Sequence, residues 1–171
     1  MADENVNPAA SRAPTLADLV ALCRRLNAEG ARYMVIGGFA IIQHGFYRTT
    51  ADIDLLIDDS LDNQRRVREA LKSLPERAIL ELGEDEDLRD WVVLRVADEV
   101  LVDVMTSACA IKYSEAAAEV QIFNIHGVDI PFASPRLLLR MKQTHRARDE
   151  EDRIFLYRKI AQEGESGGAR D

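Results

Sequence analysis

The amino-acid sequence predicts an α+β fold with a small mixed or antiparallel sheet and helices mainly on one face of that sheet. Three observations indicate this class. Apolar residues recur at helical spacing near the N-terminus, and two short apolar runs, 33–36 and 51–57, follow as expected for buried strands. Between residues 91 and 131, β-branched runs are separated by turn residues, and helical patterns fill the rest of the chain.

The expected domain covers residues 15–162. Residues 1–14 and 163–171 are polar or rich in Gly and Ser and show no periodicity, which is typical of disordered tails. Of the 171 residues, 47% are hydrophobic and 30% are charged, so one core of ordinary size is expected. The acidic start is unlike a signal peptide and no apolar run is long enough to cross a bilayer, so we expect a cytoplasmic protein without a membrane partner.

The net charge of −8 and the cysteine content narrow the classes of function. We do not expect an acidic chain to wrap a nucleic-acid duplex through its overall charge. Cys23 and Cys109 are too few for a disulfide framework, and both are expected in the core because their neighbours are apolar. No group of Cys and His residues in the sequence has the spacing of a zinc site.

The first predicted element is a helix that begins after Thr15. Thr15 and Asp18 have the spacing of a capping box, and Gly30 is suited to the position where the helix stops. The apolar residues between them form one stripe, which consists of Leu16, Leu19, Val20, Cys23 and Leu26. This helix is expected to pack on the sheet and to carry no chemistry.

The strand predicted at 33–36 ends in Gly37-Gly38, which opens a short apolar segment at 39–44. Glycines let a backbone approach a ligand closely, and free N–H groups at such a position favour an anionic phosphate. The chain then turns through Arg48 and Thr49, which could assist in phosphate binding. Taken alone, a Gly-Gly pair after a strand is most often only a turn.

The next predicted strand, 51–57, carries Asp52 and Asp54 within an otherwise apolar run. Buried carboxylates are costly unless they have a partner. Residues two apart on a strand point to the same face, roughly 6–7 Å apart, so these two can hold a divalent cation or a pair of them. A phosphate site beside metal carboxylates indicates a nucleoside triphosphate with Mg²⁺ or Mn²⁺ as the ligand.

The later elements are predicted from their patterns. The set comprises a helix at 61–74, a short strand at 78–82, antiparallel strands at 91–96 and 100–105, a partly helical segment at 107–118, a hairpin of 120–125 with 128–131, a helix at 136–145 and a final helix around 154–160. Ser134 and Pro135 are a strong helix start. Asp103 lies among β-branched residues in the strand 100–105, which leaves open whether it faces solvent.

The order strand, Gly37-Gly38, Asp52-x-Asp54 and then a strand with Asp103 resembles the signature of the nucleotidyltransferase superfamily of the DNA polymerase β type. Within it the chain is most similar to the AbiEii-type bacterial nucleotidyltransferase toxins, over about residues 16–160. The resemblance implies that the three aspartates are catalytic and hold the metal. Many members have Ser after the first glycine, so Ser is expected to be tolerated at position 38.

The C-terminal part is also similar to the AbiEii-type proteins, in which a Lys on a helix precedes an Arg-x-Lys/Arg-Asp-x-x-Asp segment. This resemblance implies that Lys142 reaches the triphosphate and that Asp149 and Asp152 order the helix junction. The residues alone leave a second interpretation open, in which Lys142 is exposed and Arg146 and Arg148 pair with the two aspartates.

The resemblance implies transfer of a nucleoside monophosphate from an NTP to an acceptor hydroxyl, with release of pyrophosphate. The acceptor is not indicated: tRNA, a protein and a small molecule are all compatible, and a cognate antitoxin would be a protein partner. Two alternatives stay open. One is a non-catalytic interaction module of a toxin–antitoxin type system, and the other is a metal-dependent phosphodiesterase.

Overall fold

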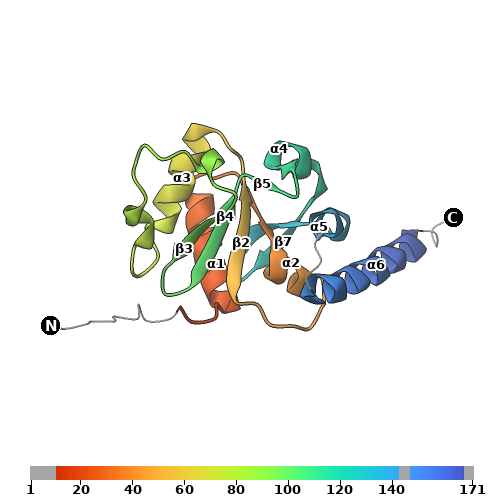
Figure 1. The fold of residues 1–171 in the computed structure, drawn as a ribbon. Coiled ribbons are helices and arrows are strands. Elements are labelled where there is room, and N and C mark those ends of the chain that lie inside the picture. Colours follow the sequence, from red (N-terminus) through yellow and green to blue (C-terminus); the bar gives the residue numbers. More distant parts are fainter. Residues whose placement is uncertain (1–10, 143–146, 168–171) are drawn as a thin grey trace.

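The computed structural model describes residues 11–142 and 147–167. Within these residues, six strands form one mixed sheet in the order β3-β4-β2-β1-β8-β7, which confirms the predicted α+β class (Figure 1). The strands are β1 (Tyr33–Ile36), β2 (Asp52–Ile57), β3 (Leu94–Ala97), β4 (Leu101–Met105), β7 (Val120–Ile125) and β8 (Val128–Ala133). A separate small hairpin consists of β5 (Ser107–Ala108) and β6 (Ile111–Lys112).

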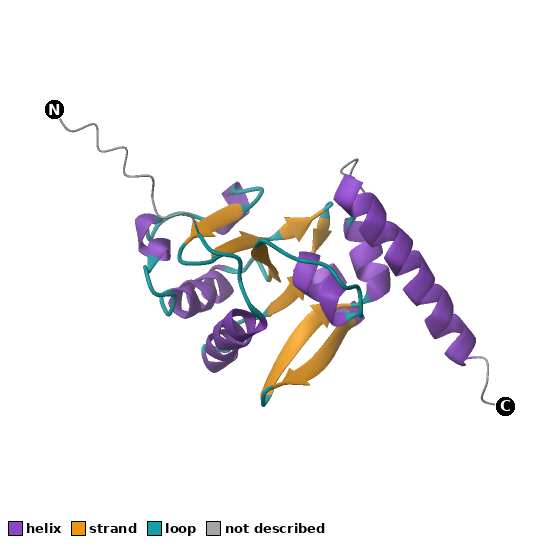
Figure 2. Cartoon of the chain, turned by 90° about the horizontal axis from the view of Figure 1, so that it is seen from below, coloured by secondary structure: helices purple, strands orange, loops and turns teal. Residues whose placement is uncertain are grey.

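The helices are α1 (Leu16–Ala28), α2 (Gly37–Gln43), α3 (Leu61–Leu71), α4 (Tyr113–Ala116), α5 (Pro135–Met141) and α6 (Ala147–Gly167). Short 3₁₀ turns lie at Ala78–Glu81, Leu88–Asp90 and Ala117–Glu119. Helices α1 and α3 pack against each other on one face of the sheet, whereas α2, α5 and α6 gather near the end of β2 (Figures 1 and 2). The long α6 extends away from the sheet (Figure 2).

The central strands are buried because the sheet is covered and each strand has neighbours on both sides. All four residues of β1 are buried between β2, which is antiparallel to it, and β8, which is parallel. Strand β2 runs parallel to β4, and this pairing sets Asp54 directly opposite Asp103. The near-continuous apolar runs at 33–36 and 53–57 are what such a doubly buried position requires.

Several predicted elements are confirmed with their end signals. Thr15 and Asp18 form a reciprocal capping box at the start of α1. The hairpin of β7 and β8 turns at His126 and Gly127, both of which have positive φ. Ser134 caps α5, its side chain accepting from the Leu137 backbone N–H, with Pro135 in the first turn.

The predicted strand at 78–82 is wrong, because this segment is a 3₁₀ turn. Arg77 adopts a left-handed conformation, and the buried carboxylate of Asp98 accepts the backbone N–H groups of Glu76 and Ala78, each at 2.9 Å. The segment at 107–118, predicted to be partly helical, begins as the β5–β6 hairpin, whose turn contains Cys109, and becomes helical at α4. Cys109 is exposed there, so only Cys23 occupies the expected core position.

The expected tails differ in part from the structure. Residues 1–10 lie outside the described residues, but Ser11 Oγ donates to the Asp98 carbonyl at 2.7 Å and the Arg12 backbone N–H donates to the Glu99 carbonyl at 2.9 Å. Helix α6 continues to Gly167 through part of the expected C-terminal tail, and α5 ends at Met141, before the undescribed 143–146. Among the described helices, none has the length and apolar character that crossing a membrane requires.

Candidate active site

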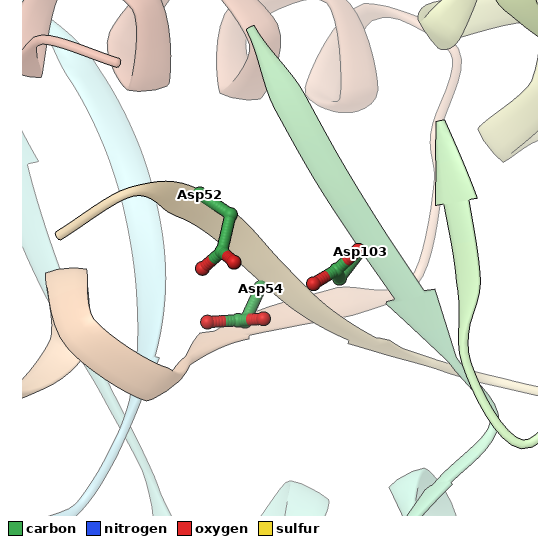
Figure 3. A group of neighbouring side chains, drawn as sticks. All are labelled: Asp52, Asp54 and Asp103. Carbon is green, nitrogen blue, oxygen red and sulfur yellow. The ribbon is translucent and has the colours of Figure 1, made fainter. Parts of the chain in front are cut away.

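Three aspartates meet at one end of the sheet. Asp52 and Asp54 on β2 and Asp103 on β4 bring one carboxylate oxygen each to within 4.8 Å of the others. Figure 3 shows the three side chains pointing toward one another. The sequence dictates this arrangement, because Asp52 and Asp54 share one face of β2 and the parallel register sets Asp103 beside Asp54. The three predicted carboxylates are therefore brought together.

The cluster cannot hold three negative charges cheaply. The pKa of Asp54 is raised to about 8, first because the carboxyl is buried and then because Asp52 and Asp103 lie beside it. Oxygen ligands of this kind are those that a hard divalent cation prefers, and a dication would stabilise the ionised form of Asp54. The residues present therefore fit a Mg²⁺ or Mn²⁺ ion.

Sequence reasoning missed a fourth member of the site, Arg95 on β3. Its guanidinium donates from Nε to Asp103 Oδ1 at 2.9 Å and from Nη2 to Asp103 Oδ2 at 2.8 Å, and Nη2 also lies 3.2 Å from Asp52 Oδ2. Arg95 faces Asp103 across the antiparallel pair β3–β4. The signal was present in the sequence, since a hairpin that closes around residues 98–100 sets residue 95 opposite residue 103.

The two glycines after β1 make room for side chains of the site itself. Gly37 has φ +65°, and a Cβ added there would overlap Asp54 Oδ2 and lie 2.8 Å from Asp54 Cγ. A Cβ on Gly38 would overlap the Thr50 hydroxyl and lie 2.7 Å from Thr50 Cβ. The expectation that Ser is tolerated at position 38 is therefore wrong, because in this chain Thr50 fills the space that the serine side chain would need.

We predict that Gly37→Ala still folds but no longer binds a divalent cation at the three aspartates. Left-handed backbone costs a non-glycine residue about 1–2 kcal/mol, and the new methyl would also push Asp54 away from Asp52 and Asp103. Gly127→Ala is the matched control, since Gly127 has φ +81° and nothing within 4 Å of its added Cβ. Urea unfolding with and without Mg²⁺ and an NTP should show that both variants are destabilised, Gly37→Ala at least as much as Gly127→Ala, and that only Gly37→Ala loses the Mg²⁺ effect. An unchanged Mg²⁺ effect in that variant would contradict the prediction.

The aspartates open into a cleft of about 540 Å³. Of the residues predicted to bind nucleotide, Gly37, Gly38, Arg48 and Lys142 line this cleft. Thr49 is exposed and is not among the lining residues, whereas its neighbour Thr50 is. The Thr50 hydroxyl donates to the Asp52 carbonyl at 3.1 Å, which holds the turn before β2 in place.

A buried ion-pair network joins the cleft to α6. Asp152 is fully buried, with Oδ1 3.3 Å from Arg48 Nε and Oδ2 3.2 Å from Lys142 Nζ. Lys142 Nζ also donates to Asp149 Oδ1 at 3.0 Å. Lys142 is therefore neither exposed nor unpaired, and its ion pairs with Asp149 and Asp152 join the end of α5 to α6. Arg48 pairs with Asp152, where the second interpretation expected Arg146 or Arg148. Arg146 lies outside the described residues.

Comparison with known proteins supports the fold. A candidate nucleotidyltransferase from Thermotoga maritima superposes with a TM-score of 0.54 and 16% identity, covering 86% of this chain and 92% of that one. An antigenic nucleotidyltransferase-like protein from Paracoccidioides brasiliensis gives a TM-score of 0.49 and 21% identity over 81% of this chain and 73% of that one. No family model and no curated protein sequence matches the chain. The first likeness shows that the chain has the nucleotidyltransferase fold.

Proposed function

We propose that the protein is a metal-dependent nucleotidyltransferase, which moves a nucleoside monophosphate from an NTP to an acceptor hydroxyl and releases pyrophosphate. One observation carries the proposal: the parallel register of β2 and β4 brings Asp52, Asp54 and Asp103 to one cleft, with carboxylate oxygens within 4.8 Å of one another. The nucleotidyltransferase fold supports nucleotidyl transfer as the class of reaction at this cleft.

The roles follow from the positions of the side chains. Asp52 and Asp54 would hold the divalent cation together with Asp103. When bound, such a cation neutralises phosphate charge and lowers the pKa of an attacking hydroxyl. Asp103, directly opposite Asp54, would accept the proton of the acceptor hydroxyl as that hydroxyl attacks.

The triphosphate would lie along the opposite wall of the cleft. Arg48 and Lys142 line that wall, and Asp152 holds both cations in fixed positions. The backbone N–H groups of Gly37 and Gly38 would contact phosphate oxygens. The hydroxyl beside Gly38 belongs to Thr50, which therefore takes the role that was expected of Thr49. The Lys142–Asp149–Asp152 junction also supports placing the chain among the AbiEii-type proteins.

The test uses NTPs labelled at the α-phosphate, with Mg²⁺ or Mn²⁺ and a panel of tRNA, proteins and small alcohols as acceptors. The expected result is label on one class of acceptor and an equal amount of released pyrophosphate. Cleavage of RNA without label transfer would indicate a phosphodiesterase instead. No reaction with any acceptor would favour a non-catalytic module, for which binding to a cognate antitoxin would be the next measurement.

A further inference from the structure

Arg95 contacts two of the three aspartates that would hold the cation. Its guanidinium contacts both oxygens of Asp103, at 2.9 and 2.8 Å, and one oxygen of Asp52, at 3.2 Å. A fork of parallel N–H groups on one carboxylate is the strongest geometry that such a pair can adopt. Arg95 is thus paired with two of the three carboxylates that would hold the metal in the proposed function.

A dication and this guanidinium compete for the same carboxylates. Each would lie in contact with Asp52 and Asp103, so the two positive charges would repel each other at short range. Asp103 is 8% exposed in its side chain, which leaves it little freedom to turn toward a second cation while Arg95 remains in place. The repulsion therefore favours the departure of one of the two positive groups.

Arg95 is the group that can move. Its side chain is 54% exposed, and β3 is an outer strand of the sheet. The neighbouring Leu94 and Val96 are buried and anchor β3, so the guanidinium can swing away without disturbing the core. Arg95 also lines the cleft, where a bound triphosphate would supply the negative charge that the side chain gives up on leaving Asp103.

We infer that Arg95 is an internal counter-ion of the site, which competes with the divalent cation for Asp52 and Asp103, so that metal binds weakly alone and much more tightly together with a nucleoside triphosphate. Arg95 is accordingly a positioning residue that acts through Asp52 and Asp103. It couples occupancy of the metal site to the presence of the nucleotide. This inference rests on the proposed function, because it assumes that the three aspartates hold a metal.

The coupling is measured with Mn²⁺ as the probe, by calorimetry or electron paramagnetic resonance, first alone and then with a non-hydrolysable ATP analogue. Arg95→Gln should lower the Kd for Mn²⁺ alone by about tenfold and should reduce the further gain from the nucleotide. Arg89→Gln is the matched control, since Arg89 loses the same charge but pairs with Asp87 and does not line the cleft. The control should bind Mn²⁺ as the parent does.

Arg95→Lys keeps the charge without the two-pronged geometry and should give a Kd between those of the parent and Arg95→Gln, which decides the matter if Arg95→Gln does not fold. If the parent transfers nucleotide but the Arg95 variants bind Mn²⁺ no more tightly than the parent does, the inference is overturned while the proposed function stays intact. A parent that neither binds Mn²⁺ nor transfers nucleotide would overturn both.

Discussion

Asp54→Asn is expected to lower the rate of nucleotidyl transfer by about 10³-fold or more, which corresponds to roughly 4 kcal/mol of transition-state stabilisation. Asn keeps the shape of Asp but cannot supply the charge that a divalent cation needs. Asp54 is the central residue of the three aspartates, since it lies on the same face of β2 as Asp52 and pairs in register with Asp103. The effect is measured as transfer of label from an α-labelled NTP at saturating Mg²⁺.

The control for this variant is Asp62→Asn. Asp62 lies in the first turn of α3, its side chain is 66% exposed, and it pairs with Arg66 on the same helix. This control should retain full activity and the same unfolding curve as the parent. Activity of Asp54→Asn within tenfold of the parent would mean that Asp54 holds no catalytic cation.

Asp152→Asn is expected to give the largest loss of stability, about 3–5 kcal/mol, because removing one partner of a buried ion pair leaves the others uncompensated. Asp152 is fully buried between Arg48 and Lys142. Losing its charge should also let both cations shift within the cleft, so the KM for the NTP should rise. Urea unfolding measures the loss of stability, and steady-state kinetics under native conditions measures the change in KM.

Glu151→Gln is the companion of that variant, since the exposed neighbouring residue on α6 loses the same charge. It should change the free energy of unfolding by less than about 0.5 kcal/mol. If Asp152→Asn unfolds at the same urea concentration as the parent, the network does not hold the α5–α6 junction, and the role proposed for Lys142 loses its structural support.

The aspartate site could be predicted from the sequence by one local rule and one resemblance. Residues two apart on a strand share a face, which relates Asp52 to Asp54. Asp103 was added by the resemblance to the nucleotidyltransferase superfamily. The strands that carry these residues could also be predicted from local patterns in the sequence. The order of elements and the helix caps at Thr15 and Ser134 are local signals as well, and the structure confirms both caps.

The remaining features depend on contacts between distant residues, which local patterns do not carry. Asp98 bonds to the backbone of Glu76 and Ala78 and so turns an apolar segment that was expected to be a strand. The choice of Thr50 over Thr49 follows from how the turn packs on Gly38. Arg48 pairs with Asp152, which lies more than 100 residues later in the chain, so no local spacing relates the two residues.

The most direct test of a metal site at the aspartates is the melting temperature of the parent and of Asp54→Asn, in EDTA and in Mg²⁺. The folded-state pKa of Asp54 is about 8, above the ordinary value. A carboxyl group raised in this way contributes stability that is complete below its unfolded pKa, about 3.9. That contribution is lost as the pH rises through about 8.

In EDTA, Asp54→Asn should therefore melt higher than the parent, by more at about pH 9 than at about pH 5, because Asn does not ionise. Mg²⁺ with an NTP should raise the melting temperature of the parent, since a ligand that binds only the native state stabilises it by RT ln(1 + [L]/Kd), and should raise that of Asp54→Asn much less. If Asp54→Asn melts lower than the parent in EDTA, and Mg²⁺ with an NTP does not raise the melting temperature of the parent, then Arg95 already satisfies these carboxylates and they hold no metal.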